Sequence, residues 1–133
     1  MSKLEEQVAK LLSAGGIRFK REVSFPDLKS LKGKRLRFDF VLYDTNGRIW
    51  KILEVDGAQH FKWTPHFQKT VFDFKRTQEW DRIKNSYCLR KKIPLIRVPY
   101  WDFDENLTLR KILTNPAYCV KSKYHNDNLI KAG

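Results

Sequence analysis

An Asn-Gly turn between two apolar segments constrains the fold of this chain more than any other feature. Residues 36–43 and 49–55 both have the composition of strands, and Thr45, Asn46 and Gly47 lie between them. Asn-Gly is a preferred two-residue turn of β-hairpins because both positions adopt a positive φ. The pattern therefore predicts that the two segments pair as antiparallel strands.

The predicted hairpin brings carboxylates together. Asp39 interrupts the apolar run of the first strand, and Glu54 and Asp56 share one face of the second. Like charges at close range repel, and a shared divalent cation or a raised pKa is the usual compensation. We therefore predict a metal-dependent hydrolytic centre in which Asp39, Glu54 and Asp56 are ligands of Mg²⁺, for which Mn²⁺ would substitute.

Two of these carboxylates also have a purely structural explanation. Asp39 could neutralise a nearby arginine or lysine, and Glu54 could form a cross-strand ion pair. Their clustering with Asp56 favours the metal site over these explanations.

Four further residues are candidates for the same site. Glu5 stands in the first turn of a predicted helix, where capping and the helix dipole already explain a carboxylate. Gln59 and His60 follow a tight glycine turn and can fold back over the carboxylates. His60 suits a general base, a phosphate-contacting acid or a core imidazole equally well. Lys84 suits a surface ion pair with Asp81, or a lysine that reaches over the sheet and stabilises charge on a phosphorus under attack.

Hydrophobic periodicity predicts the remaining elements. They are a helix over residues 4–14, a strand over 17–23, a long packed loop over 57–75, a helix over 75–92, an apolar strand over 93–100 and a helix from about residue 105 to 113. The length suits one domain. We predict an α/β (α+β) domain over residues 1–114, with a mixed central sheet flanked by helices, and a basic tail over 115–133.

The net charge of +12 is concentrated outside the carboxylate segment. Residues 23–37 hold five basic and one acidic side chain, and residues 68–92 hold eight and three. Such segments suit a polyanion, although a generically basic, soluble surface would have the same composition. The predicted nucleic-acid contacts are Lys32, Lys34, Arg35, Arg37, Lys75, Arg76 and Arg97, of which Arg97 could instead neutralise the acidic cluster.

The composition also predicts a soluble, cytoplasmic protein that does not associate with membranes. No stretch approaches the ~18 consecutive apolar residues of a membrane span. Cys88 and Cys119 are too few and too isolated for a disulfide framework or a Cys-rich zinc site, so we expect two buried thiols.

Five motifs, in this order, resemble the PD-(D/E)XK nuclease superfamily, and particularly its branch of very-short-patch-repair-type, phage and homing-type endonucleases. The motifs are Ser2-x-x-Glu5-x-x-Val8, Leu36-Arg37-Phe38-Asp39-Phe40, Glu54-Val55-Asp56-Gly57-Ala58-Gln59-His60-Phe61, Asp81-Arg82-Ile83-Lys84-Asn85-x-Tyr87-Cys88 and Leu95-Ile96-Arg97-Val98-Pro99-Tyr100. The resemblance implies a restriction-endonuclease-like αβββαβ core, and a location in the host cytoplasm if the protein is encoded by a phage.

The resemblance also implies a chemistry. Asp39 and Glu54 would be metal ligands, Glu5 would join them from the first helix, and the activity would be magnesium-dependent cleavage of phosphodiester bonds. The sequence departs from the superfamily pattern at Asp56, where a lysine is usual. Gln59, His60 and Lys84 are the candidates to replace that lysine.

We therefore expect a Mg²⁺-dependent endodeoxyribonuclease that acts on duplex or branched DNA, as a monomer or a homodimer. A non-catalytic nucleic-acid-binding protein on the same fold is one alternative. A ribonuclease is the other, because RNA offers the same phosphodiester.

Overall fold

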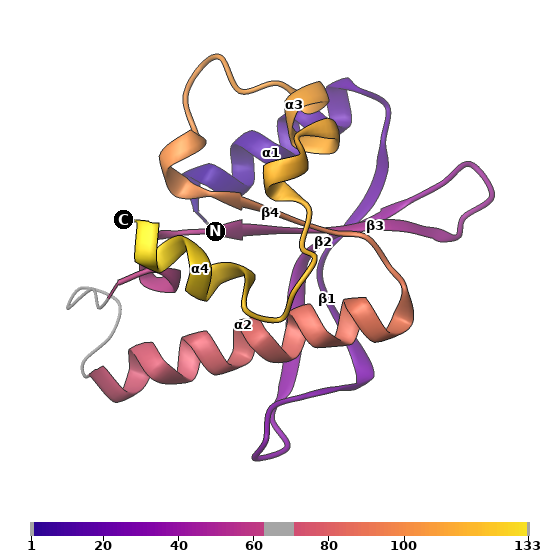
Figure 1. The fold of residues 1–133 in the computed structure, drawn as a ribbon. Helices are drawn as coiled ribbons and strands as arrows, with labels where there is room; N and C mark the ends of the chain where they lie inside the picture. The colour runs from indigo at the N-terminus through magenta and orange to yellow at the C-terminus, as the bar shows by residue number, and fades with distance from the viewer. Residues whose placement is uncertain (1, 63–70, 133) are drawn as a thin grey trace.

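A computed structural model describes residues 2–62 and 71–132, which form a mixed sheet with helices on both faces (Figure 1). The elements are α1 (Lys3–Ala14), β1 (Arg18–Lys29), β2 (Arg35–Tyr43), β3 (Ile49–Asp56), α2 (Val71–Lys91), β4 (Leu95–Pro99), α3 (Leu109–Thr114) and α4 (His125–Ala132), with short 3-10 helices at Ala58–His60, Tyr100–Asp102 and Pro116–Tyr118.

The sheet confirms the predicted α+β fold and its αβββαβ order. The strands lie in the order β1-β2-β3-β4; β1, β2 and β3 are antiparallel neighbours, and β4 is parallel to β3. The predicted hairpin between β2 and β3 is present, and Gly47 has a φ of 79° at its turn. The turn chemistry thus identifies the central strand pair.

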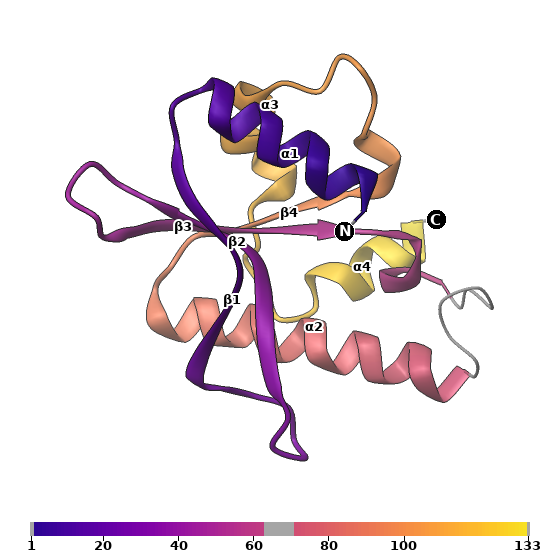
Figure 2. The same ribbon diagram turned by 180° about the vertical axis from the view of Figure 1, so that it is seen from behind.

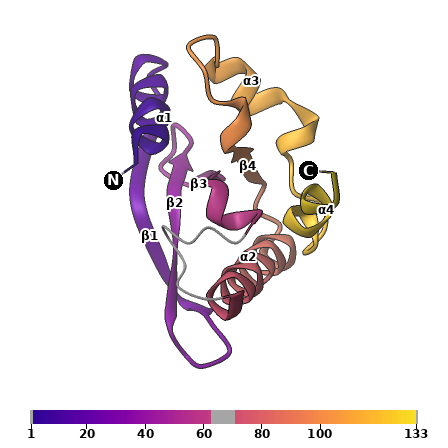
Figure 3. The same ribbon diagram turned by 90° about the vertical axis from the view of Figure 1, so that its left-hand side faces the viewer.

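Two hydrophobic clusters attach the helices to opposite faces of the sheet. Val8 and Leu12 of α1 belong to one cluster, together with residues of α3. Tyr87 and Cys88 of α2 belong to the other. Figures 2 and 3 show α1 and α3 on one side of the strands and α2 and α4 on the other. The functional candidates therefore come from several elements that meet at the sheet.

Strands β1 and β2 twist so strongly that their alternation changes face halfway along. Phe38 packs in the cluster on the α2 side, whereas Phe40, two residues later, packs in the cluster on the α1 side. Arg21 pairs with Phe40 and Val23 pairs with Phe38. Asp39, between the two phenylalanines, therefore lies opposite Glu22. Glu22 has a left-handed backbone with a φ of 53°. Asp39 therefore lies at the point where the inward-facing side chains of β2 change from one face of the sheet to the other.

Several element boundaries differ from the predictions, and α3 begins at Leu109 rather than near residue 105. Strand β1 continues through Pro26 to Lys29, which an edge strand permits because its outer N–H groups need no partner strand. Helix α2 begins at Val71 rather than near residue 75. Trp63 and Phe67, two aromatic residues of the predicted loop, lie outside the described residues.

The prediction of a basic tail after residue 114 is wrong. Val120 is buried and its N–H donates to the carbonyl of Leu95 in β4. The segment ends in helix α4, where the side chain of Asn126 is buried. The polar composition concealed this packing, because only a few side chains of the segment enter the interior.

The two cysteines differ in burial. Cys88 is buried as predicted, whereas Cys119 is exposed. Its neighbours Tyr118 and Val120 point inward, so the residue between them faces outward in this extended segment. No helix within the described part of the chain is long and apolar enough to cross a membrane.

Candidate functional site

Asp39 and Glu54 form the centre of the candidate site, on adjacent strands. The N–H of Val55, next to Glu54 on β3, donates to Oδ2 of Asp39 over 2.7 Å. Burial and the neighbouring Glu54 carboxylate both raise the pKa of Asp39 well above its ordinary value. At neutral pH, with no cation bound, Asp39 therefore holds a proton while Glu54 carries the negative charge.

Lys84 of α2 neutralises Glu54 directly. Its Nζ lies 2.8 Å from Oε1 of Glu54, and the two side chains are 14% and 2% exposed. Burial alone would raise the pKa of Glu54, but the Lys84 ammonium, the hydrogen bond with Asp39 and the charge of Arg97 together outweigh burial and lower the pKa. Of the two explanations for Lys84, the structure therefore agrees with a lysine that reaches over the sheet. Its reach could not be read from the sequence, because it depends on how α2 packs.

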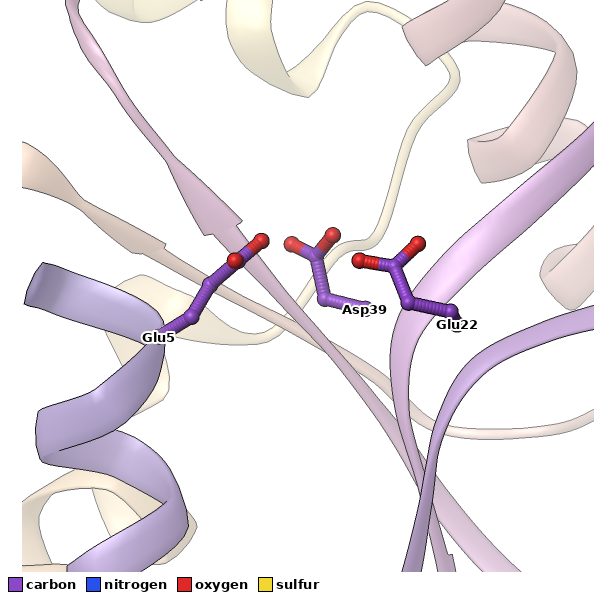
Figure 4. A group of neighbouring side chains, drawn as sticks. All are labelled: Glu5, Glu22 and Asp39. Atoms are coloured by element: carbon purple, nitrogen blue, oxygen red, sulfur yellow. The ribbon is translucent and has the colours of Figure 1, made fainter. Parts of the chain in front are cut away.

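Glu5 and Glu22 extend the acidic group on the other side of Asp39. Figure 4 shows the Asp39 carboxylate between those of Glu5 from α1 and Glu22 from β1. One oxygen from each of the three residues lies within 4.8 Å of the others. Glu5 also receives a hydrogen bond from the Ser2 N–H, so its capping role and its place in this group coexist. The structure therefore brings Glu5 to the site as predicted.

The sequence analysis missed Glu22. Its predicted strand has apolar residues at 17, 19 and 23, which leaves Glu22 as an ordinary outward-facing residue. The register of β1 against β2 was the signal needed, because it sets Glu22 opposite Asp39. The connection between β1 and β2 contains no recognisable two-residue turn. Short-range patterns therefore did not predict how the two strands align.

The donor set suits a hard divalent cation. Asp39, Glu54, Glu5 and Glu22 offer carboxylate oxygens, the ligands that Mg²⁺ and Mn²⁺ prefer. The protonation of Asp39 is the expected response of crowded carboxylates when no such cation is present. Glu22 is exposed and Glu5 partly so, which leaves this side of the group open to solvent. Glu5, Glu22 and Asp39 lie close enough together to hold a metal ion between the sheet and α1, and Glu54, which contacts Lys84 of α2, adjoins Asp39.

Asp56 lies elsewhere, contrary to the prediction that it shares the metal site. Oδ1 of Asp56 lies 2.7 Å from Nη1 of Arg97, and its Oδ2 accepts a hydrogen bond from Asn126 over 2.9 Å. Both oxygens therefore already have strong partners. Asp56 and Arg97 are each only 1% exposed, so they form a buried ion pair. A buried charge requires such compensation.

The prediction that Arg97 contacts nucleic acid is wrong. Its guanidinium is buried and also donates to Oδ1 of Asn85 over 2.7 Å. The structure agrees instead with the other explanation, that Arg97 neutralises acidic residues. Strand β4 is buried on both faces, so the side chain of Arg97 cannot reach solvent from it.

His60 belongs to the same buried network. Its Nδ1 lies 2.8 Å from Oδ2 of Asp81 and 3.6 Å from Oδ1 of Asp56. Burial opposes the imidazolium, but the two carboxylates outweigh it and raise the pKa of His60 to about 9. A protonated imidazole cannot accept a proton at neutral pH, so the arrangement disfavours a general base. It fits a core imidazole whose hydrogen bonds are satisfied.

The side chain of Gln59 folds back against Gly57, whereas its expected position over the carboxylates stays a prediction. A Cβ atom on Gly57 would lie 2.6 Å from Oε1 of Gln59, so the amide occupies the space beside that glycine. This position follows the end of β3, where the buried Asp56 stands. Gln59 thus borders the buried network that contains Asp56.

The remaining basic candidates occupy two surfaces. Arg35 and Arg37 are exposed on β2. Four others lie together in a pocket between the β1–β2 connection and α2; they are Lys32, Lys34, Lys75 and Arg76. The sequence placed these four in two separate basic segments, and the fold makes one surface of them.

Comparison with known proteins leaves the chain without a family. It is 42% identical over 68 residues to an uncharacterised protein, 307L, of Invertebrate iridescent virus 6. The match covers 51% of this chain and 34% of that protein, so the chain matches about a third of its relative's length. No family model matches the chain, and no solved structure does.

Proposed function

We propose that this protein is a metal-dependent endonuclease of the PD-(D/E)XK type that hydrolyses phosphodiester bonds in DNA. The observation that carries the proposal is the contact of Lys84 Nζ with Glu54 Oε1 beside the half-buried Asp39. It unites two acidic residues on adjacent strands with one lysine, and such groups can hold a divalent cation and stabilise the charge that develops on a phosphate.

Asp39 and Glu54 would hold the metal, and Glu5 and Glu22 would complete or orient its ligands from the solvent side. A bound divalent cation would supply a Lewis acid at the scissile phosphate and a more acidic water. The hydrogen bond from Val55 fixes Asp39 at the sheet, so the carboxylate is positioned before substrate arrives.

Lys84 would replace the lysine that is absent at Asp56. Its ammonium is held on α2, which approaches β3 from the face opposite α1. Burial lowers the pKa of Lys84, but its ion pair with Glu54 and the nearby Asp81 help to raise it above its ordinary value, so the amine stays charged at neutral pH. A permanent positive charge there would stabilise the negative charge that develops on phosphate oxygens.

One feature favours the alternative of a binding protein without catalysis. The charge of Glu54 is already neutralised by Lys84, and Asp39 is protonated, so the group is electrostatically satisfied without a metal. Under this alternative the basic surfaces would bind nucleic acid and the carboxylates would only support the fold.

Nicking of a supercoiled plasmid distinguishes the two functions. The wild-type protein is expected to nick the plasmid with Mg²⁺ or Mn²⁺ and not with EDTA. Asp39→Asn keeps an oxygen for the Val55 N–H but removes a metal ligand, and should lower the rate by about 100-fold or more. A structured RNA in parallel reactions identifies the ribonuclease alternative.

The matched control is Glu105→Gln, which makes the same change of charge at an exposed position outside the carboxylate group. It should cleave at the wild-type rate, and circular dichroism should show the same fold for both variants. Metal-independent binding without any nicking by the wild-type protein would contradict the endonuclease and support the binding protein.

A further inference from the structure

A pocket opens between the β1–β2 connection and the first half of α2. Its volume is about 370 Å³, which is in the usual range for pockets that bind small ligands. Four cationic side chains, Lys32, Lys34, Lys75 and Arg76, line it against one carboxylate, Glu79. Arg76 also forms an ion pair with Asp73 over 3.0 Å, so the three lysines supply the net positive charge that suits an anionic ligand.

Aromatic and apolar side chains line the same pocket. Phe72 is 65% exposed and Leu31 is 82% exposed, and both line this pocket, so they form an exposed apolar patch there. Trp80 lies beneath two cations: Lys34 Nζ is 4.6 Å and Arg76 Cζ is 5.3 Å from its ring centroid. The pocket thus combines exposed flat apolar surface with cations on its rim.

We propose that this pocket binds an unpaired nucleobase and its adjoining phosphates, so that the substrate carries a single-stranded segment. The inference rests on the proposed function, whose substrate class it narrows. Bases stack on aromatic side chains irrespective of sequence, and lysines and arginines hold the flanking phosphates. A base inside a duplex is stacked on its neighbours and cannot enter a pocket until it is unpaired.

Glu79 favours a nucleic acid over an acidic polypeptide. Its carboxylate lines the pocket among the four cations. A carboxylate there can accept a hydrogen bond from the exocyclic amino group of a base. The side chains of an acidic peptide offer no such donor for Glu79.

The pocket lies beside the candidate catalytic group along α2. Arg76, Trp80 and Lys84 are spaced four residues apart, so they form one stripe on the helix, with about 6 Å between successive residues. Arg76 and Trp80 line the pocket, and Lys84 contacts Glu54. The first turns of α1 and α2 also lie at the same end of the molecule, at the left in Figure 1. Binding in the pocket would therefore hold a strand near the carboxylates.

Fluorescence anisotropy with a labelled single-stranded oligonucleotide tests the pocket. The measurement is made in EDTA, where no cleavage occurs, so failure of base binding and failure of catalysis are separate results. Phe72→Ala should weaken binding by about 10-fold, the usual effect of removing one base–aromatic stack. Leu89→Ala, an exposed apolar residue of the same helix outside the pocket, should bind as the wild type does.

A second ligand separates stacking from charge. An oligonucleotide of the same length with abasic sites keeps the phosphates but lacks bases, so Phe72→Ala and the wild-type protein should bind it equally weakly. Lys34→Gln should weaken the binding of both oligonucleotides. Lys111 is exposed on α3, so Lys111→Gln should change neither affinity beyond the general effect of removing one surface charge.

Three results would overturn the proposal. They are equal affinity of the wild-type protein for the normal and abasic oligonucleotides, unchanged binding by Phe72→Ala, and displacement of the oligonucleotide by polyglutamate as effectively as by unlabelled single strand. The last result would identify an acidic polypeptide as the occupant. Asp39→Asn should retain full binding, because it lies outside the pocket.

Discussion

Within the part of the chain that the structure describes, the ionisable residues packed around β3 form two groups with different properties. Glu54 has Lys84 as its counter-ion, and the adjacent Asp39 holds a proton. Asp56, in contrast, has strong partners on both oxygens. Only the first group gains from an added cation, because it alone includes a carboxylic acid that a metal would deprotonate. This asymmetry distinguishes the candidate site from a structural ion network.

At the scale of single residues, His60 should make stability depend on pH. Its pKa is raised from 6.5 to about 9 in the folded protein. The group therefore stabilises the fold fully below about pH 6.5, and this contribution is lost as the pH rises through about 9. At about 1.4 kcal/mol for each pH unit between the two pKa values, the contribution is on the order of 3 kcal/mol.

Urea denaturation of the wild-type protein and His60→Gln measures this contribution. Glutamine keeps a hydrogen-bond donor beside Asp81 but carries no charge. The free energy of unfolding should differ between the two proteins at pH 6 and converge toward pH 9.5. A difference that stays constant over this interval would show that His60 is not held as an imidazolium.

At the scale of the elements, the twist of β1 and β2 creates the site and strains it. Glu22 adopts a left-handed backbone that favours glycine, directly across from Asp39. Strained residues of this kind concentrate at functional sites. The backbone conformation that directs the Glu22 carboxylate toward Asp39 therefore lowers the stability of the strand pair.

Replacing Glu22 should separate stability from activity. Glu22→Gly removes the backbone strain and one of the crowded carboxylates, and should raise the free energy of unfolding by about 1 kcal/mol. It should also lower the rate of plasmid nicking, because a residue near the metal is lost. Chemical denaturation and the nicking assay provide the two measurements.

Glu22→Gln is the control for charge. It removes the carboxylate but keeps a side chain at the left-handed position, so it should lose activity without the gain from relieved strain. If glycine proves no more stable than glutamine, the conformation of Glu22 is not strained. Wild-type activity in both variants would remove Glu22 from the site.

At the scale of the whole molecule, the distribution of charge suggests how a polyanion would be held. The net charge is +12, yet the acidic residues near Asp39 face one another at the sheet. The exposed basic candidates lie on β2 and around the pocket beside α2. A nucleic acid could therefore bind the cations while its phosphates approach a local acidic group that binds metal.

Binding should accordingly depend steeply on salt. With about six phosphate contacts, the affinity for DNA should fall by about 1,000-fold between about 50 and 200 mM salt. Anisotropy titrations in EDTA at several salt concentrations give the slope. Asp39→Asn should leave the slope unchanged, and the double variant Lys32→Gln/Lys34→Gln should reduce it by about 2. Affinity that is insensitive to salt would contradict the proposed electrostatic contact.

Local sequence patterns predicted most of the fold and the centre of the candidate site. The Asn-Gly turn predicts the β2–β3 hairpin, and the hairpin predicts that Asp39 and Glu54 meet. Short-range turn chemistry and alternation are encoded within a few residues, which explains these successes. Local patterns did not predict the surroundings of Asp56. Alternation places Asp56 on the same face as Glu54, but it does not show which side chains pack against that face.

The partners on that face come from distant parts of the chain. Arg97 and Asn126 bind Asp56, and Lys84 binds Glu54, through contacts that span 30 to 70 residues. Composition could not predict that residues after 114 would fold back, because their few buried side chains follow no periodic pattern.

The sequence by itself determined the order of the elements up to residue 114, the central hairpin and the basic character of the protein, because periodicity, turn chemistry and charge are local properties. Only the tertiary structure decided that Glu22 and Lys84 join Asp39 and Glu54, and that Arg97 is withdrawn into the interior with Asp56. The physical reason is that the partner of a buried charge is selected by packing and desolvation, which depend on which distant segments the fold brings together.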